Sequence, residues 1–171
     1  MQPKRPSKPR AFTGNWVRHM QQKKVNGRRE TREWIMQFLF QLDFNPEPID
    51  IALKDFWEEK NPSERERNYA EEIIKGVVQH KKELDERLSQ YANRWNSDRM
   101  GAVDRTVMRV ALFEMLYRED IPPVVSINEA VHFAKDFSSF QSGRFVNGVL
   151  DRIRKDIDRP ARTTYKPKGN E

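Results

Sequence analysis

The chain has 171 residues and carries 32 Lys or Arg against 26 Asp or Glu, a formal net charge of +6. This length is enough for one domain that buries a core, with tails beside it. The absence of cysteine excludes disulfides, thiolate metal sites and a cysteine nucleophile. No apolar run approaches the roughly 20 residues of a membrane span, and the basic N-terminus lacks the apolar stretch of a secretory signal, so a cytoplasmic protein is expected.

The positive charge is concentrated at the two ends of the sequence. Residues 1–32 hold ten Lys or Arg and one acid, and residues 152–171 hold seven basic and three acidic residues. The middle, residues 33–151, holds 15 basic and 22 acidic residues. An acidic body with basic ends is typical of a protein that binds a polyanion through flexible cations. Improved solubility is the alternative explanation of the basic ends.

Both ends are predicted to lack fixed structure. Residues 1–27 combine prolines and glycines with many cations, which predicts a disordered basic arm. Because such an arm positions no group against a base, we expect it to add affinity for any nucleic acid and little specificity. Residues 158–171 predict a second loose basic tail. Residues 28–157 between them are predicted to form one helical domain.

The first helices are predicted from apolar spacing and from proline. An apolar face over residues 34–42 predicts a helix that stops at Asn45-Pro46, and a short helix over residues 49–57 follows. Ser63 and Glu66 then form a predicted capping box at the start of a longer helix.

The second half of the domain contains a helix that is apolar on almost every side. Helical spacing continues to Tyr91, and residues 103–116 are then nearly all apolar. Such a helix is normally buried at the centre of a bundle. Arg109 and Glu114 are its charged interior residues, and we expect Glu114 to have a structural ion-pair or capping role because an unpaired buried carboxylate is costly.

Two further helices close the domain. Pro122-Pro123 ends the preceding helix, and Ser126 with Glu129 predicts a capping box for a helix over residues 127–137. The last helix has Gly148 in its interior. A glycine inside a helix costs about 1 kcal/mol against alanine, so we expect Gly148 to lie at a close helix crossing. Strand alternation is absent, and the predicted fold is all-α with about seven helices.

The sequence contains no pattern of catalytic or metal-binding residues. His19, His80 and His132 are scattered, and the phosphate-loop, dinucleotide-binding and nucleophile-elbow motifs are missing. Most carboxylates fall on helix faces that are expected to be solvated. No enzymatic activity, cofactor or metal is therefore predicted.

An arginine cluster is the strongest candidate for a binding site. Arg28, Arg29 and Arg32 lie where the arm enters the first helix, and helical spacing lets Arg29 and Arg32 project from one side of its first turn. Cations at a helix N-terminus oppose the helix dipole, which favours a functional reason for their presence. Glu30 and Glu33 partly offset that cost. An ordinary basic helix start is the alternative.

Several segments together resemble one protein family. They are Ser126-Ile127-Asn128-Glu129-Ala130, residues 143–151 (GRFVNGVLD), Val103-Asp104-Arg105, Leu112-Phe113-Glu114 and residues 28–33. Over residues 28–155 the chain resembles the NusB family of transcription antitermination factors. The resemblance implies a bundle of two packed three-helix units.

The resemblance also implies a function. NusB-like proteins join NusE, a small-subunit ribosomal protein, and bind boxA-type single-stranded RNA with it. With other Nus factors they support processive elongation of rRNA operons by RNA polymerase. Two alternatives stay open: a helical interaction scaffold that has lost RNA binding, and a detached NusB-like domain of an RNA cytosine methyltransferase.

The resemblance implies RNA-binding positions. Arg28, Arg29 and Arg32 match the family's arginine-rich motif, which Glu30 interrupts. At the position of Phe40 many family members have a tyrosine that contacts an RNA base. Phe40 keeps the aromatic ring that can stack on a base but lacks the hydroxyl group. Packing of Phe40 in the core is the alternative.

Further positions follow from the same resemblance. Arg99 and Arg105 flank the entry to the apolar helix and resemble RNA-facing positions, and Asp104 between them resembles a protein-partner position. Phe140, Gln141 and Arg144 surround the Ser-rich connector of the last two helices, whose counterpart faces NusE. Many members have an acid where this chain has Gln141. Packing of Phe140 back onto the core is the alternative to a partner contact.

Overall fold

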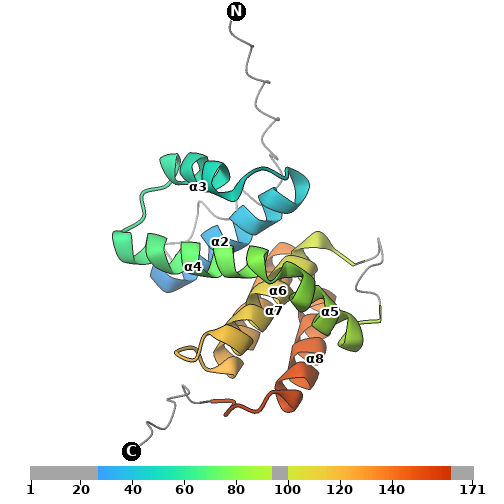
Figure 1. Ribbon diagram of the computed structural model, residues 1–171. Helices are drawn as coiled ribbons and strands as arrows, with labels where there is room; N and C mark the ends of the chain where they lie inside the picture. The colour runs from blue at the N-terminus through green and yellow to red at the C-terminus, as the bar shows by residue number, and fades with distance from the viewer. Residues whose placement is uncertain (1–26, 94–99, 163–171) are drawn as a thin grey trace, which may run out of the picture.

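A computed structural model describes residues 27–93 and 100–162 of the chain (Figure 1). These residues form seven α-helices and no strand, which confirms the predicted all-α class. The predicted arm up to residue 26, Arg99, and the chain after residue 162 lie outside the described residues. The helices are α2 (Gly27–Phe44), α3 (Ile49–Glu58), α4 (Glu64–Gln79), α5 (Lys81–Tyr91), α6 (Ala102–Tyr117), α7 (Pro123–Phe137) and α8 (Phe140–Asp156).

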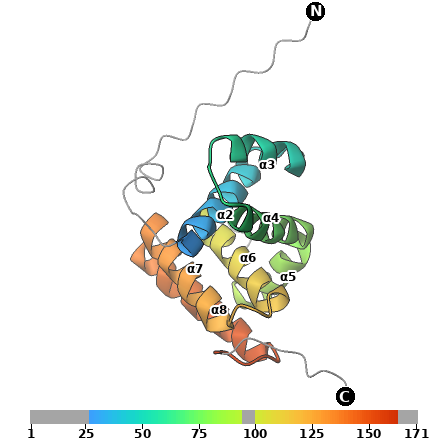
Figure 2. The same ribbon diagram turned by 90° about the vertical axis from the view of Figure 1, so that its left-hand side faces the viewer.

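The helices are arranged as two units around α6 (Figures 1 and 2). In the first unit α2 packs along α4, and α3 rests against α2. In the second unit α7 packs between α6 and α8, and α5 covers α6 and α8 from another side. Because α6 also contacts α2 and α4, it joins the two units.

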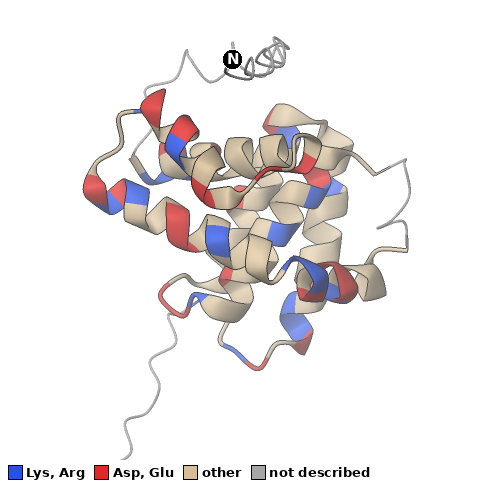
Figure 3. Cartoon of the chain, turned by 45° about the horizontal axis from the view of Figure 1, so that its top comes forward, with Lys and Arg blue, Asp and Glu red and all other residues tan. Residues whose placement is uncertain are grey.

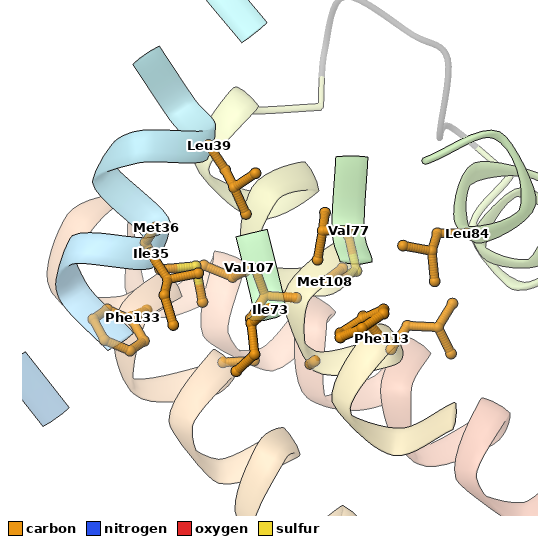
Figure 4. Packing of buried hydrophobic residues seen from close by; sticks show 14 of the residues in the cluster. Ile35, Met36, Leu39, Ile73, Val77, Leu84, Val107, Met108, Phe113 and Phe133 are labelled. Atoms are coloured by element: carbon orange, nitrogen blue, oxygen red, sulfur yellow. The ribbon is translucent and has the colours of Figure 1, made fainter. Parts of the chain in front are cut away.

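The central position of α6 follows from its composition. Six of its apolar side chains are at most 2% exposed: Val107, Met108, Val110, Ala111, Leu112 and Met115. Figure 4 shows Val107 and Met108 among Ile35 and Met36 of α2, Ile73 and Val77 of α4, and Phe133 of α7. Each large apolar side chain buried here stabilises the fold by about 1.5–3 kcal/mol. The prediction of a centrally buried helix over residues 103–116 is confirmed.

One of the two predicted capping boxes is present. The Ser63 hydroxyl accepts from the Glu66 amide at 3.3 Å, and the Glu66 carboxylate accepts from the Ser63 amide at 2.8 Å. The box predicted at Ser126 is wrong, because α7 already begins at Pro123. Proline in the first turn of a helix has its φ angle preset and needs no amide partner. Ser126 therefore lies inside α7, where it is 1% exposed.

The packing role predicted for Gly148 is wrong. Gly148 is exposed, and a Cβ atom added there would meet no atom within 4 Å. Two glycines inside helices are instead tightly packed: a Cβ at Gly76 would overlap the Phe113 ring, and a Cβ at Gly143 would overlap the Lys135 side chain. The close crossing predicted on α8 therefore lies at Gly143, five residues earlier than expected.

The predicted tail begins with an ordered segment. Arg159 donates to the carbonyl oxygens of Met115 at 2.8 Å and Ile121 at 2.6 Å, and the Val124 amide donates to Ala161 at 3.0 Å. Carbonyl groups at the end of a helix need such donors. Burial lowers the pKa of Arg159. The prediction of a loose tail from residue 158 is therefore wrong for the segment through Ala161.

Candidate nucleic-acid interface

The first turn of α2 lies beside the end of α7. Arg29 Nη2 donates to Asp136 Oδ2 at 2.9 Å, and Arg29 Nε lies 3.7 Å from Glu33 Oε1. The Arg29 side chain is 33% exposed. The guanidinium group therefore has solvent access, and its planar fork fits a phosphate as well as a carboxylate.

Arg28 and Arg32 lie on another side of α2 from Arg29. Both line a cavity between α2 and α4, whereas Arg29 reaches α7. The step of three residues from Arg29 to Arg32 falls about 60° short of a full helical turn, which moves the side chain toward α4. Arg28 is exposed, but Arg32 is only 7% exposed. The prediction that Arg29 and Arg32 project together is therefore wrong.

Arg32 belongs to a buried polar network around Glu114. Arg32 Nε lies 3.4 Å from Glu114 Oε1, which also accepts from the Tyr69 hydroxyl at 3.3 Å. The Ser126 hydroxyl donates to Glu114 Oε2 at 2.6 Å. Burial, together with the charge of Glu114, raises the pKa of Tyr69 and keeps the hydroxyl protonated as a donor. The ion pair predicted for Glu114 is confirmed, and it links α2, α4, α6 and α7.

Arg109, the other charged residue inside α6, also has partners. Its Nε donates to Asp85 Oδ1 at 2.6 Å and its Nη1 to Asp43 Oδ2 at 2.7 Å. Burial alone would lower the pKa of Arg109, but Asp85 and Asp43 hold it above its ordinary value. These contacts tie α5 and the end of α2 to α6, so Arg109 has a structural role.

Phe40 is half-buried between three helices. Its ring lines a small cavity with Val103 of α6 and Phe137 of α7, and its centroid lies 4.9 Å from that of Phe44. Part of the ring thus packs on the core, and part remains exposed. Both interpretations of Phe40, packing and stacking, are compatible with this position.

The start of α6 lies next to the connector between α7 and α8. Arg105 is half-buried, and its Nη1 donates to the Met100 carbonyl at 2.8 Å. Asp104 is 6% exposed, and burial raises its pKa while the hydroxyls of Ser142 and Ser138 oppose that shift. The carboxylate of Asp104 therefore faces the connector, and an outward partner contact by this residue is not compatible with the geometry.

The connector presents an aromatic ring to solvent. Phe140 is 65% exposed, and Lys135 Nζ lies 5.3 Å from its ring centroid. Gln141 and Arg144, on the first turns of α8, are exposed as well. The Ser139 hydroxyl caps α8 by accepting from the Ser142 amide at 3.0 Å. The alternative in which Phe140 packs back onto the core is therefore wrong.

Contacts of Arg29, Phe40 and Phe140 all involve residues at the end of α7. Asp136 accepts a hydrogen bond from Arg29, Phe137 lines the same small cavity as Phe40, and Lys135 lies over the Phe140 ring. Ser138, which caps α7, lies beside Asp104. Lys135 and Asp136 were not among the predicted site residues. Their only signal was their position in the last turn before a serine-rich connector.

The described part of the chain is not strongly basic. Eleven of the 32 Lys or Arg, but only two of the 26 acids, lie in residues 1–26, 94–99 and 163–171, which leaves 21 basic and 24 acidic residues in the described part. Figure 3 shows both signs interspersed over the helices. Among the described residues, no acidic or histidine cluster is placed to hold a metal ion, and no helix could span a membrane.

Comparison with known families gives a match along most of the sequence. The model of the NusB family matches residues 29–155. The transcription antitermination protein NusB of Methylacidiphilum infernorum is 41% identical over 135 residues, covering 78% of this chain and 94% of that protein. The protein of the same name from Anaeromyxobacter dehalogenans is 45% identical over 136 residues, with 79% and 94% covered.

Solved structures show the same fold. A structure of T. maritima NusB superposes with a TM-score of 0.69 at 34% identity, covering 81% of this chain and 95% of that one. A crystal structure of the antitermination factors NusB and NusE in complex with dsRNA also has a TM-score of 0.69, at 26% identity, with 77% and 98% covered.

Proposed function

The chain belongs to the NusB family, and on that premise we propose that it is a transcription antitermination factor that binds boxA-type single-stranded RNA together with NusE. It acts without catalysis, as part of the RNA polymerase elongation complex with other Nus factors, and supports processive transcription of rRNA operons. Transcription of this kind takes place in the cytoplasm, which is the proposed location.

The observation that carries the RNA-binding part of the proposal is the cluster at the end of α7. The short segment of residues 135–138 lies beside three such groups: the partly exposed Arg29, the half-exposed ring of Phe40 and the exposed ring of Phe140. Arginine for phosphate and an aromatic face for an unstacked base are the groups that recognise single-stranded RNA. We assign the RNA contact to Arg29 and Phe40, supported by Arg28 and Arg105.

The NusE contact is assigned to the connector and the start of α8. Phe140, Gln141 and Arg144 are exposed there, and Phe145 adds a further apolar surface that is 39% exposed. A protein partner beside the RNA face lets two weak surfaces act on one RNA, which raises the effective affinity without new chemistry.

Replacing Arg29 with alanine is expected to weaken RNA binding while the fold stays intact. The lost hydrogen-bonded pair with Asp136 is partly exposed, and exposed pairs contribute about 0–1 kcal/mol to stability. Loss of one phosphate contact lowers the slope of log K against log salt by about one unit. Affinity for a boxA oligonucleotide is measured by fluorescence anisotropy at several salt concentrations, with thermal melting alongside.

Two further variants sharpen this test. Arg87→Ala removes the same charge from α5, where Arg87 pairs with Glu83 at 3.5 Å, and it serves as the matched control. Asp136→Asn removes the carboxylate that holds Arg29 and is expected to strengthen RNA binding. If Arg29→Ala and Arg87→Ala weaken RNA binding equally, only the net charge of the chain affects RNA affinity, and Arg29 is not part of the RNA site.

A further inference from the structure

An aromatic surface lies at the end of α2. Phe40 and Phe44 are about one helical turn apart, and their ring centroids lie 4.9 Å from each other. Phe44 is 56% exposed and Phe40 is half-buried, so the two rings together form one aromatic surface at this end of the helix. Exposed apolar surface of this kind marks interaction sites in folded domains. Phe44 has no part in the proposed RNA contact.

Two acids close to this surface in the sequence lack a counter-charge. Glu47 and Asp50 follow Phe44 by three and six residues, where the chain passes from α2 into α3. Both are exposed, and in the described part of the chain neither forms an ion pair. Asp43, by contrast, is already paired with Lys81 at 2.7 Å. The two unpaired acids beside exposed rings fit a segment that combines an aromatic side chain with cations.

The N-terminal arm of the same chain has this composition. Residues 1–26 hold seven Lys or Arg and no acid, and their aromatic residues are Phe12 and Trp16, with Arg18 close behind. The NusB family model matches the chain only from residue 29, so the arm lies outside the matched part. A tryptophan offers a large contact area and has few rotamers to lose on docking. The opposite charges attract the arm most strongly at low salt.

The arm is long enough to reach the aromatic surface. Phe40 lies 13 residues after Gly27, the first residue of α2, which is a distance of about 20 Å along the helix axis. Ten residues separate Trp16 from Gly27, and a chain of that length spans up to about 33 Å. The arm can therefore turn back along α2 and place Trp16 on the two rings.

We propose that residues 12–18 of the arm dock on the surface formed by Phe40 and Phe44, with Trp16 against the rings and the cations of the arm toward the acids that follow α2. Docking and RNA binding then exclude each other at Phe40, so the arm controls access to that part of the RNA site. This consequence rests on the proposed function, whereas the docking itself does not. The remaining cations of the arm keep the general affinity for nucleic acid expected from the sequence.

A spin label on the arm of the full-length chain tests the docking. The sequence has no cysteine, so Thr13→Cys provides a single attachment point for a nitroxide, which broadens the NMR signals of nearby residues. We expect broadening of the backbone signals around Phe40, and its loss when Trp16→Ala or Phe44→Ala is added. Phe44 is replaced because Phe40 packs partly on the core. Phe145→Ala is the matched control, since Phe145 is an exposed phenylalanine of α8.

The same label shows whether the contact lies within one molecule. Spin-labelled chain is mixed with isotope-labelled chain that carries no spin label, and we expect no broadening in the mixture. Broadening there would assign the surface to the arm of a second copy and would overturn the proposal. The proposal is also overturned if the label broadens no signal around Phe40, or if Phe145→Ala removes the broadening as Phe44→Ala does.

Binding of a boxA oligonucleotide tests the competition. RNA is expected to remove the broadening around Phe40, and Trp16→Ala is expected to strengthen RNA binding about twofold, the factor for an arm that is docked in half of the molecules. RNA binding by Trp16→Ala that is unchanged or weaker would overturn the competition. A chain that shows the broadening but binds no RNA would contradict the proposed function and leave the docking standing.

Discussion

Replacing Glu114 with alanine is expected to lower the free energy of unfolding by about 3–5 kcal/mol, the usual cost of removing one partner from a buried ion pair. The carboxylate is 1% exposed and receives the Tyr69 and Ser126 hydroxyls as well as the Arg32 charge. Its loss leaves a buried cation and two donors without an acceptor. Urea denaturation followed by circular dichroism measures the change.

Glu72→Ala is the matched control for this prediction. Glu72 also pairs with an arginine, Arg118, but its side chain is 64% exposed. Exposed pairs contribute about 1 kcal/mol or less, so the control is expected to remain close to the unchanged protein. If Glu114→Ala lowers the free energy of unfolding no more than Glu72→Ala does, the network around Glu114 does not hold the two helical units together.

Alanine at Gly76 and alanine at Gly148 are expected to change stability in opposite directions. Gly148 is exposed with open space around it, so the alanine gains about 0.5–1 kcal/mol of helix propensity. At Gly76 the new methyl group would overlap the Phe113 ring, which is 5% exposed and packed on Tyr117. Overpacking of this kind costs about 1–3 kcal/mol and outweighs the propensity gain.

Because both glycines lie inside helices, each variant is the control for the other. Denaturation curves of the two single variants and of the unchanged chain provide the comparison. Lower stability of Gly148→Ala would mean that another group covers this face of α8. Higher stability of Gly76→Ala would mean that the Phe113 ring moves aside without loss of packing.

The local features of the fold could be predicted from sequence because they depend on neighbouring residues. Apolar spacing located the helices, and the Ser63 capping box involves residues only three positions apart. The prediction of a capping box at Ser126 was wrong because Pro122-Pro123, which was interpreted as the end of one helix, instead begins the next helix. Both prolines suit a helix start as well as a helix end, so spacing alone does not decide between them.

The candidate site depended on contacts between distant residues and was predicted less well. The sequence predicted that Arg28, Arg29 and Arg32 act as one cluster. In the structure Arg32 pairs with the buried Glu114, whereas Arg29 pairs with Asp136 on α7. Similarly, nothing in the sequence distinguishes Gly148, which is exposed, from Gly76, which is covered by Phe113. Apolar spacing indicates which face of a helix is buried, but tertiary packing decides which neighbour each position on that face meets.

Binding of boxA RNA in the presence and absence of NusE tests the central claim most directly. Full-length chain and NusE from the same organism are titrated, separately and together, into a labelled boxA oligonucleotide and into a scrambled one at fixed salt. We expect the pair to bind boxA about tenfold or more tightly than either protein alone, with a smaller gain for the scrambled RNA, because two linked surfaces act on one strand. Equal affinity for the two RNAs, or no gain from NusE, would contradict the account.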